Sequence, residues 1–279
     1  MVDHLHFTNA LSVSLDELAS AFNAGFAGYF YPMHMTSEIL ARRVRMEHVD
    51  LQQSLLADNG EELVGFALLG LRGREAWCGG LGIVPKFRGN GFARQLMSEL
   101  FTRARACGVT RLSLEVLTKN TPAIRLYERF GMRVTRDLLI LEHTGTANSI
   151  KGSWQELHDA EPDTLLRNFE RLHTWQPAWQ RDSASLLSAD GLHGVCLGND
   201  DEPDAYALLV TRPDGVTQVI DLAAASAAHA GVLSADLANS CGAIRVVNEP
   251  EDSFFITALI EHGFTEVERQ YEMSCHLSS

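Results

Sequence analysis

Hydrophobic and polar residues follow two distinct periods along the chain, and the helical period comes first. Residues 14–23 and 37–48 carry apolar side chains three and four positions apart, which predicts two helices with one buried face each. Ser14 and Glu17 form a capping-box pattern at the start of the first helix, where amide groups need acceptors. The pattern therefore starts with two amphipathic helices.

Short apolar runs replace the helical period in the next segment. Residues 53–57, 63–71 and 76–84 predict three strands. The connections at residues 58–60 and 72–74 are short and contain glycine, which is typical of hairpin turns. We therefore expect neighbouring, antiparallel strands here.

The helical period returns after a glycine-rich turn. One helix is indicated by an apolar stripe four residues apart, formed by Phe92, Leu96, Leu100 and Ala104. A strand, a short helix ended by Gly131 and a final strand are predicted after it, at residues 111–117, 120–130 and 134–141. Together with the earlier segments, these elements form one compact α/β unit.

A polar stretch at residues 143–152 predicts a linker, so the expected domains are residues 1–145 and 146–279. The second half repeats helices and strands in a weaker pattern. Helices are predicted at residues 161–172, 223–238 and 251–261, and strands at residues 194–197, 206–211, 216–222, 244–247 and 264–273.

Charge is divided unevenly between the two halves. Residues 1–145 carry 16 Lys and Arg and 15 Asp and Glu, whereas residues 146–279 carry 7 and 21. The first half therefore has a net charge of +1 and the second of −14, so the whole negative excess of the chain lies in the second half, which argues against nucleic acid as its partner. An acidic surface of this kind favours solubility, and it would also attract a cationic amine or a basic peptide.

Composition excludes several other classes of protein. No apolar run reaches the length of a membrane span, and the first residues lack the pattern of a signal peptide. The five cysteines are scattered without a C-x-x-C motif, so we expect reduced thiols, a cytoplasmic location and no bound metal. We expect no membrane partner.

The segment Arg88-Gly89-Asn90-Gly91-Phe92-Ala93 joins a predicted strand to a predicted helix. Its glycines let the backbone approach a ligand, and unpaired amides at the start of the helix would face an anion. Lys86, Arg88 and Arg94 add positive charge nearby. A turn of this kind is often only a turn, so the six residues alone leave phosphate binding open.

The downstream residues Asn120, Ala123, Leu126-Tyr127 and Gly131-Met132 complete a second pattern. With the turn at residues 88–93, they make residues 1–145 resemble the GNAT superfamily of acyl-CoA-dependent N-acyltransferases. The turn matches the family's signature [Q/R]-x-x-G-x-[G/A], and the later residues match N-x-x-A-x-x-[L/F]-Y-x-x-x-G-F except at Met132. The resemblance implies an α/β (α+β) fold in which helices flank a mixed, mostly antiparallel sheet.

The second half resembles the first in its order of elements. Glu261-His262-Gly263-Phe264 echoes Arg129-Phe130-Gly131-Met132, and aligning the two glycines places Leu259 opposite Tyr127. No phosphate-binding signature precedes its alanine-rich segment. We therefore expect a degenerate GNAT-like domain in tandem with the first, the alternative being an unrelated α/β domain.

The resemblance implies that acetyl-CoA is the co-substrate and that backbone groups of one strand hold its pantetheine arm and polarise the thioester. The residues expected to bind it are Leu81, Gly82, Ile83, Val84, Arg88, Gly89, Asn90, Gly91, Phe92, Ala93, Arg94 and Asn120. Asn120 fits either a pantetheine contact or a helix cap, and the two roles are compatible.

Two side chains are candidates for proton transfer. The family motif makes Tyr127 the general acid for the leaving thiolate, since a phenol stays protonated at neutral pH. Glu115 is the candidate general base, although it could equally orient a neighbour through hydrogen bonds. Four other candidates for the base are Asp50, Glu75, His34 and His48.

The acceptor is expected to meet the aromatic segment that contains Tyr29, Phe30, Tyr31 and His34, where rings could receive an ammonium group. Plain core packing is the competing interpretation of this segment. Cys78 is a weaker candidate for an acyl-carrying nucleophile, because no paired base is evident.

The sequence therefore predicts direct acetyl transfer from acetyl-CoA to a primary amine, either a small amine or a peptide N-terminus. The second domain would support the first, shape the acceptor site or form a homodimer. Two other functions remain open: a non-catalytic acyl-CoA-binding regulator, and a scaffold whose acidic half binds a basic protein.

Overall fold

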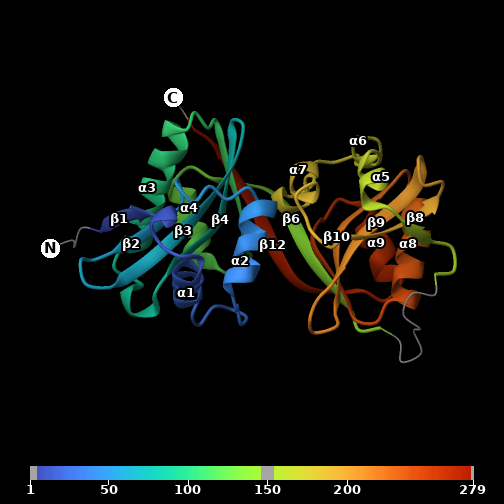
Figure 1. Cartoon of the computed structure of the whole chain (residues 1–279), viewed down its shortest axis with the longest axis horizontal. Helices are drawn as coiled ribbons and strands as arrows, with labels where there is room; N and C mark the ends of the chain where they lie inside the picture. The colour runs from blue at the N-terminus through green and yellow to red at the C-terminus, as the bar shows by residue number, and fades with distance from the viewer. Residues whose placement is uncertain (1–4, 146–153, 278–279) are drawn as a thin grey trace. The chain divides into compact units, whose positions relative to one another are not determined.

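The computed structural model describes residues 5–145 and 154–277 of the 279-residue chain. It contains two compact units. Unit 1 extends to Thr135 and also includes the C-terminal residues from Glu272, whereas unit 2 comprises Arg136–Tyr271 (Figure 1). The mixed α/β class with a mostly antiparallel sheet is confirmed.

The sheet of unit 1 has the strand order β1-β2-β3-β4-β5. β1 to β4 are antiparallel neighbours, and β5 joins β4 in the parallel direction. The strands are β1 (His6–Asn9), β2 (Leu55–Asp58), β3 (Leu63–Arg72), β4 (Glu75–Ile83) and β5 (Arg111–Leu117). The three strands and two hairpins predicted between residues 53 and 84 are thus confirmed within two residues, whereas β1 was not predicted.

In the described part of unit 1, four α-helices flank this sheet: α1 (Leu15–Gly25), α2 (Ser37–Met46), α3 (Phe92–Ala106) and α4 (Thr121–Arg129). The capping box at Ser14 is present, with both reciprocal hydrogen bonds to Glu17. The side chain of Thr36 caps α2. Short 3-10 turns precede α1 and α3, at η1 (Ala10–Ser12) and η2 (Pro85–Phe87).

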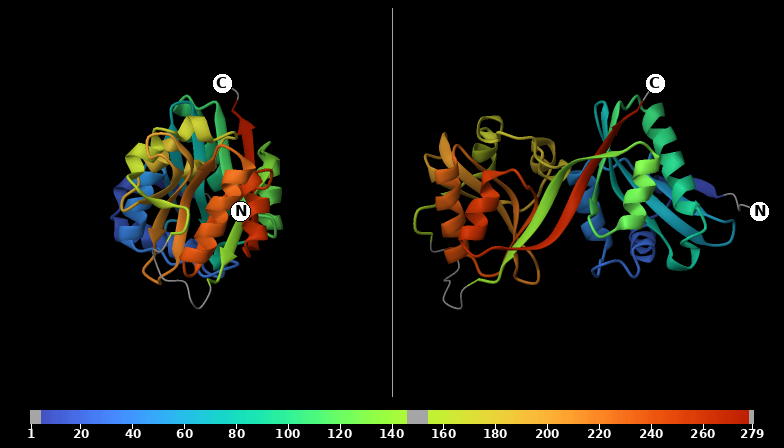
Figure 2. Two further views of the ribbon diagram at one scale, coloured as in Figure 1. Left: turned by 90° about the vertical axis from the view of Figure 1, so that its right-hand side faces the viewer. Right: turned by 180° about the vertical axis from the view of Figure 1, so that it is seen from behind.

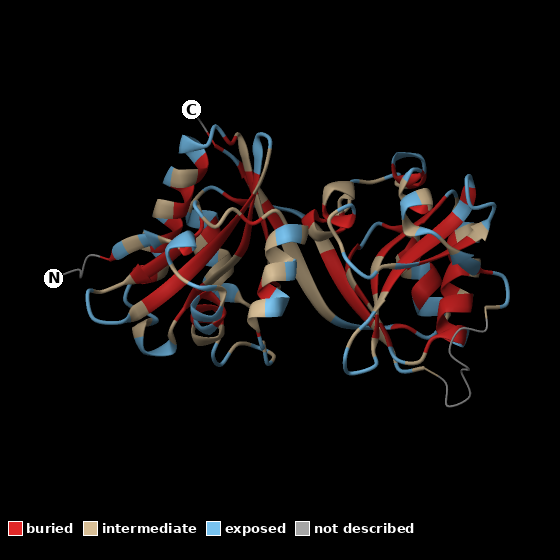
Figure 3. Cartoon of the chain, viewed as in Figure 1, coloured by how far each residue is buried: buried red, intermediate tan, exposed pale blue. Residues whose placement is uncertain are grey.

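The core of unit 1 lies on both faces of the sheet. On one face, Leu18 and Phe22 of α1 and Leu40 of α2 pack against Phe66 and Leu68 of β3. Side chains alternate along a strand, so neighbouring positions of β3 point to the other face. α3 packs on that face against β3 and β4, and α3 and α4 lie in front of the sheet in the right panel of Figure 2. Most residues of the central strands β3 and β4 are buried (Figure 3).

The strands of unit 2 follow the order β6-β11-β10-β9-β8-β7, and the first residues of β6 belong to unit 1. β10 and β11 are parallel, and the other neighbouring pairs of this order are antiparallel. The strands are β6 (Arg133–His143), β7 (His158–Ala160), β8 (His193–Gly198), β9 (Pro203–Thr211), β10 (Thr217–Ala224) and β11 (Ile244–Pro250). A short parallel pair is also the arrangement of β4 and β5 in unit 1.

The helices of unit 2 depart from the prediction at several places: residues 179–186 contain two short helices that were not predicted, and the helix expected at residues 251–261 begins at Phe254. The helix expected at residues 161–172 is interrupted, because Asn168 turns its side-chain amide to the carbonyls of Thr164 and Asp201. The helix expected at residues 223–238 begins later, since β10 continues to Ala224 and Ser226 is the cap. The helices are α5 (Pro162–Leu166), α6 (Phe169–Leu172), η3 (Trp179–Arg181), α7 (Ser183–Leu186), α8 (Ala227–Ser240) and α9 (Phe254–Glu261).

The last strand, β12 (Thr265–His276), is divided between the two units. Its residues from Glu272 belong to unit 1, where Thr135 donates a hydrogen bond to the carbonyl oxygen of Glu272 at 3.0 Å. Leu277 likewise donates its amide to the carbonyl oxygen of Thr110 at 2.9 Å. The division expected between residues 145 and 146 had left this segment in the second domain. Residues 146–153 of the predicted linker lie outside the described residues.

Candidate functional site

The pairing of β4 with β5 ends early in unit 1. Their register runs from Glu75 opposite Arg111 to Trp77 opposite Ser113, although the strands continue to Ile83 and Leu117. The register of β4 on β3 also shifts next to Leu69, which leaves Gly79 as the extra residue of a bulge. Beyond this bulge, alternate backbone groups of β4 point away from β3 without a partner in β5. Leu81, Gly82 and Ile83, predicted to hold pantetheine, lie on this stretch.

Gly82 is required by close packing at this point. A Cβ atom at position 82 would lie 2.6 Å from the ring of Phe66 and 3.0 Å from the backbone of Gly25. Such contacts are too short for any side chain, so β4 approaches α1 with backbone alone. The close approach joins the predicted cofactor strand to the end of the helix that precedes the aromatic segment.

The turn between β4 and α3 exposes a row of amide groups. Gly89 and Gly91 have φ values of 83° and 82°, and Gly91 is the N-cap of α3. Within the described residues, the amides of positions 89–93 have no hydrogen-bond partner; the next amide, of Arg94, binds the carbonyl oxygen of Gly91 at 3.1 Å. Consecutive amides at a helix start form an anion-binding concavity. Five of the predicted cofactor residues therefore form one donor surface.

The cationic side chains near the turn have different surroundings. Arg88 donates to the carbonyl oxygens of Ile83 at 2.9 Å, Ala27 at 2.7 Å and Gly25 at 3.1 Å, so its guanidinium ties the turn to the end of α1. Lys86 pairs with Glu62. The expected positive charge near the turn is thus partly used in structural contacts.

Arg94 has different neighbours from Arg88. It lines a pocket of about 420 Å³ together with Ser98, Arg129 and Phe130, between the start of α3 and the end of α4. Two guanidinium groups at the rim of one pocket can attract a phosphate. Arg129 was not among the predicted residues, because neither family signature includes its position.

Tyr127 lies in α4, whose N-terminus is fixed by Asn120. The Asn120 side chain accepts a hydrogen bond from the amide of Ala123 at 3.3 Å, so the predicted capping role is observed. Tyr127 is 8% exposed, and its hydroxyl has no hydrogen-bond partner among the described residues. Burial, with smaller contributions from Cys78 and Tyr29, raises its pKa well above the usual value. The phenol therefore carries its proton at neutral pH.

Glu115 of β5 accepts a hydrogen bond from the indole of Trp77 in β4, with 2.8 Å between Nε1 and Oε2. Trp77 is 1% exposed, and the guanidinium of Arg43 lies 5.6 Å from the centre of its ring. The same guanidinium donates to the carbonyl oxygen of Gly79 in the bulge. Trp77 and Arg43 were not predicted; only the position of Trp77, two residues before the glycine-rich part of β4, could have indicated its role.

Cys78 is unsuited to carry an acyl group. Burial, reinforced by the charge of Glu115, raises the pKa of its thiol to about 12. A thiol of this kind is protonated at neutral pH and is a weak nucleophile. This observation favours direct transfer over a covalent intermediate on this residue.

The predicted acceptor segment forms an aromatic cluster. The rings of Phe26, Phe30 and Tyr31 lie 5.1–5.4 Å from that of Tyr29. Phe30 is 48% exposed, and the ammonium group of Lys119 lies 5.4 Å from its ring centre. The segment thus includes an accessible ring that already receives a cation. The side chain of His34 is exposed.

Three of the alternative bases are placed differently from Glu115. Glu75 opens β4, at the opposite end from the amide row, and pairs with Arg111 at 3.6 Å. Asp50 accepts hydrogen bonds from the amides of Gln52 and Gln53 in a loop. His48 follows the end of α2, and its backbone has a positive φ. Glu115 is therefore the carboxylate that the fold places at the separation of β4 and β5.

Unit 2 contains a related pair of strands, joined by a buried charge cluster. β10 and β11 pair only from Thr217 opposite Ile244 to Val219 opposite Val246. Both strands then contain a register shift against their other neighbours, next to Asp221 in β10 and Glu249 in β11. Asp221 and Glu249 have fully buried side chains.

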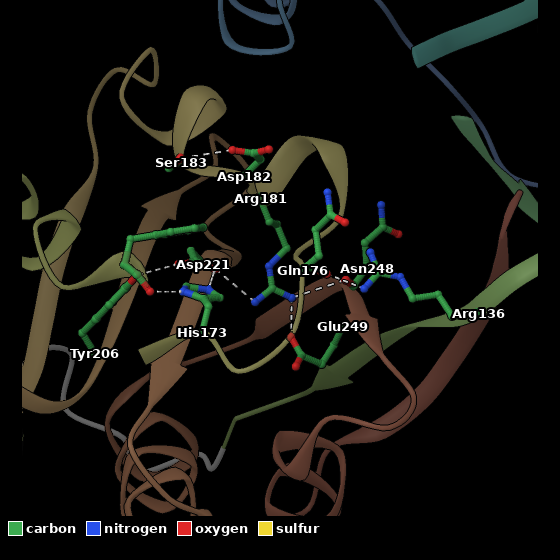
Figure 4. Close-up of polar contacts among 11 residues, drawn as sticks. Arg136, His173, Gln176, Arg181, Asp182, Ser183, Tyr206, Asp221, Asn248 and Glu249 are labelled. Atoms are coloured by element: carbon green, nitrogen blue, oxygen red, sulfur yellow. Dashed lines mark hydrogen bonds and ion pairs between the residues drawn. The ribbon is translucent and has the colours of Figure 1, made fainter. Parts of the chain in front are cut away.

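Arg181 of η3 bridges these two strands (Figure 4). Its guanidinium contacts Asp221 of β10 at 3.3 Å and pairs with Glu249 of β11. Tyr206 donates its hydroxyl to Asp221 at 2.9 Å, and His173 contacts the same carboxylate at 3.2 Å. A charged group thus links β10 to β11 beyond the end of their pairing.

The cluster also changes the acidity of its members. Burial opposes the charged form of His173, but the charge and hydrogen bond of Asp221 outweigh it and raise the pKa. Burial raises the pKa of Tyr206 far above its usual value, and Asp221 adds to that shift. Both groups therefore keep their own protons at higher pH and direct them toward the Asp221 carboxylate.

Comparison with known proteins identifies the class of unit 1. The sequence model of the Acetyltransferase (GNAT) family matches residues 16–132, which include both strands, the amide row and α4. This part of the chain belongs to the GNAT family, as its signatures predicted.

The most similar proteins include a mycothiol acetyltransferase of Acidothermus cellulolyticus, 31% identical over 150 residues, which are 48% of this chain and 46% of the relative. The chain spans less than half the length of the curated relatives that it matches.

Two solved structures share the fold of nearly the whole chain. A tandem GNAT protein from the clavulanic acid biosynthesis pathway has a TM-score of 0.72 at 13% identity, with 99% of each chain covered. A GCN5-related N-acetyltransferase from Sphaerobacter thermophilus has a TM-score of 0.69 at 13% identity, covering 99% of this chain and 96% of its own. The tandem GNAT arrangement predicted from the sequence is therefore confirmed at the level of the fold.

Proposed function

We propose that unit 1 is an N-acetyltransferase that moves acetyl from acetyl-CoA directly to a primary amine. The observation that carries this proposal is the row of five unpaired amides at positions 89–93, placed directly after the strand that separates from its neighbour. The row offers a diphosphate the donors that a helix start provides. The backbone groups of β4 that have no partner in β5 could form hydrogen bonds with an extended acyl-carrying arm.

Acetyl-CoA fits this arrangement through groups that the chain itself supplies. The amide row would bind the pyrophosphate, and the backbone of residues 81–84 would bind the pantetheine arm. Arg94 and Arg129 line the adjacent pocket and would attract the remaining phosphate. The bound thioester supplies an activated acetyl group. The protein would orient it and stabilise developing negative charge with backbone donors of β4.

Proton transfer falls to two side chains in this proposal. Tyr127 would donate its hydroxyl proton to the departing thiolate, because the hydroxyl has no hydrogen-bond partner among the described residues and burial keeps it protonated. Glu115 would take the proton of the attacking amine, and its hydrogen bond to Trp77 would fix the carboxylate between β4 and β5. The aromatic segment with Tyr29, Phe30, Tyr31 and His34 would receive the amine.

The acceptor class divides into small amines and peptide N-termini. The name of the mycothiol acetyltransferase relative makes mycothiol-related amines part of the first class to be tested. Across the described residues, no helix combines the length and apolar character needed to cross a bilayer. Release of free thiol from acetyl-CoA, measured against both acceptor classes, tests the proposal.

A regulator that binds acyl-CoA without turnover is the alternative function. The amide row supports binding as well as catalysis, so binding alone does not separate the two. Acceptor-dependent thiol release establishes the transferase. Tight acetyl-CoA binding without release from any acceptor of a broad panel favours the regulator.

Substitution of Gly91 tests the amide row. We expect Gly91→Ala to raise the KM for acetyl-CoA about tenfold, because a loss of ~1.4 kcal/mol matches one hydrogen bond to a charged group. The backbone there has a φ of 82°, which alanine adopts at a cost of about 1 kcal/mol, so the amides would shift. Steady-state kinetics and calorimetric binding measure the change.

Gly108→Ala provides the matched control for this experiment. Gly108 follows α3 with a φ of 74°, and an added Cβ there also meets open space. Both variants carry the same kind of backbone strain, so their losses of stability should be similar. An equal rise of the KM for acetyl-CoA in both variants would contradict the assignment of the amide row to acetyl-CoA binding.

Substitution of Glu115 separates its two interpretations. We expect Glu115→Gln to lower kcat about tenfold or more at neutral pH, because an amide still accepts from Trp77 but takes no proton. Glu75→Gln, at the exposed start of β4, should leave kcat unchanged. If Glu115→Gln keeps the wild-type kcat and pH profile, the carboxylate only orients Trp77.

A further inference from the structure

Three potential metal ligands meet at one edge of unit 2, outside the proposed transferase site. The Nε2 atom of His158 lies 2.7 Å from Oδ1 of Asp200 and 3.3 Å from Sγ of Cys196. The sulfur lies 3.7 Å from the same carboxylate oxygen. All three atoms are thus close enough to share a single partner.

The fold brings these residues together from separate elements. His158 of β7 and Cys196 of β8 are directly opposite each other in an antiparallel pair, so their side chains lie on the same face. Asp200 lies in the β8–β9 turn, four residues after Cys196, where Gly198 has a φ of 91° and lets the chain fold back. No sequence spacing would reveal this cluster, because the pairing of β7 with β8 creates it.

The turn that carries Asp200 is held in place by partly buried polar contacts. The amide of Asn168 donates to the carbonyl oxygen of Asp201 at 3.0 Å. Arg171 donates to the carbonyl oxygen of Pro203 at 2.7 Å and to Asn168 at 2.8 Å. Supporting contacts of this kind fix the position of a ligand before an ion arrives.

A catalytic Cys–His–Asp arrangement does not explain this geometry. In such a triad one ring nitrogen faces the thiol and the other faces the carboxylate. Here the same Nε2 atom faces both groups, so the ring cannot carry a proton between them.

We propose that His158, Cys196 and Asp200 form a binding site for a divalent transition metal of the Zn²⁺ type. Imidazole, thiolate and carboxylate are the ligands that Zn²⁺ takes in proteins. Ligand atoms at ~2.0–2.3 Å from a tetrahedral ion lie roughly 3.3–3.6 Å apart. The two contacts of the sulfur are already close to this spacing, and the exposed His158 and Asp200 side chains have room to separate.

The accessibility of the three groups defines the kind of site. Cys196 is buried, whereas the side chains of His158 and Asp200 are 45% and 54% exposed. An ion would therefore enter from solvent and rest on the sulfur at the base. With three protein ligands, the fourth position would be taken by water or by an external ligand. This inference is independent of the proposed transferase activity.

Cobalt substitution tests the site with a direct spectroscopic readout. Metal-free full-length protein, without an affinity tag, is titrated with Co²⁺ and then with Zn²⁺. We expect one equivalent of Co²⁺ to produce thiolate-to-cobalt charge-transfer absorption and the visible bands of a tetrahedral ion, and Zn²⁺ to displace it. Cys196→Ser should abolish the charge-transfer band, and Asp200→Asn should weaken binding about tenfold or more.

Two variants serve as matched controls. His193→Asn removes an exposed histidine of β8, the strand that carries Cys196. His193 pairs with Asp159 at 3.2 Å, outside the cluster. Cys107→Ser removes the exposed thiol of the chain's first half. Both should keep the wild-type spectrum. Absence of a thiolate band, or a band that follows Cys107 instead of Cys196, overturns the proposal; Asp200→Asn keeps it testable if Cys196→Ser does not fold.

Discussion

Replacing Tyr127 with phenylalanine is expected to lower kcat about a hundredfold, the usual effect of losing a positioned general acid. The ring fills the same space in the variant, and the hydroxyl has no hydrogen bond to lose among the described residues. The free energy of unfolding should therefore change by less than about 0.5 kcal/mol. Because burial keeps the phenol protonated, the wild-type rate should show no loss at mildly alkaline pH that is due to Tyr127.

The measurement is acceptor-dependent thiol release, with acetyl-CoA binding followed separately by calorimetry. Tyr271→Phe is the matched control, because it removes a partly exposed hydroxyl from β12 and should leave kcat unchanged. Acetyl-CoA affinity should stay within about threefold in both variants, since the hydroxyl would act on the leaving group. A Tyr127→Phe enzyme with wild-type kcat would assign the leaving-group proton to another donor.

The local elements of unit 1 were predictable because their signals are local. The capping box at Ser14, the glycine turns of the hairpins and the apolar stripe of α3 each specify one element within a few residues. The amide row follows from the same source, since two glycines of positive φ before a helix determine where its first amides point. The signature at residues 88–93 therefore specifies backbone geometry, which is why it could be recognised in the sequence.

Contacts between distant residues were not predictable from periodicity. The guanidinium of Arg88 reaches the carbonyls that end α1, and Arg43 reaches the bulge at Gly79, in each case across many intervening residues. The C-terminal segment from Glu272 belongs to unit 1 for a similar reason: strand pairing does not depend on distance along the chain. A division of the chain by sequence position alone could not show that.

The charge cluster of unit 2 lies at the limit of what the sequence indicates. Asp221 and Glu249 stand in apolar strands, where an isolated carboxylate contradicts the pattern, yet nothing in the pattern identifies Arg181 as their partner. Buried charges require compensation, so two carboxylates on adjacent strands imply a cation from elsewhere. This reasoning predicts that a partner exists without naming it.

Substitution of Arg181 is expected to have the largest effect on stability. Arg181→Met leaves the buried carboxylates of Asp221 and Glu249 without their shared cation, and removing one member of a buried pair costs about 3–5 kcal/mol. Urea unfolding followed by tryptophan fluorescence measures this change. Three of the four tryptophans, Trp154, Trp175 and Trp179, lie in unit 2, so the signal reports chiefly on that unit.

Two comparisons separate the loss of charge compensation from general damage. Arg212→Met removes an exposed pair with Asp214 in the same unit and should cost less than about 1 kcal/mol. Combining Arg181→Met with Asp221→Asn and Glu249→Gln removes the uncompensated charges and should recover part of the lost stability. If the triple variant is less stable than Arg181→Met, the guanidinium stabilises unit 2 through packing and hydrogen bonds. If the triple variant recovers stability, the role of Arg181 is to compensate the buried carboxylates that β10 and β11 carry where their pairing ends.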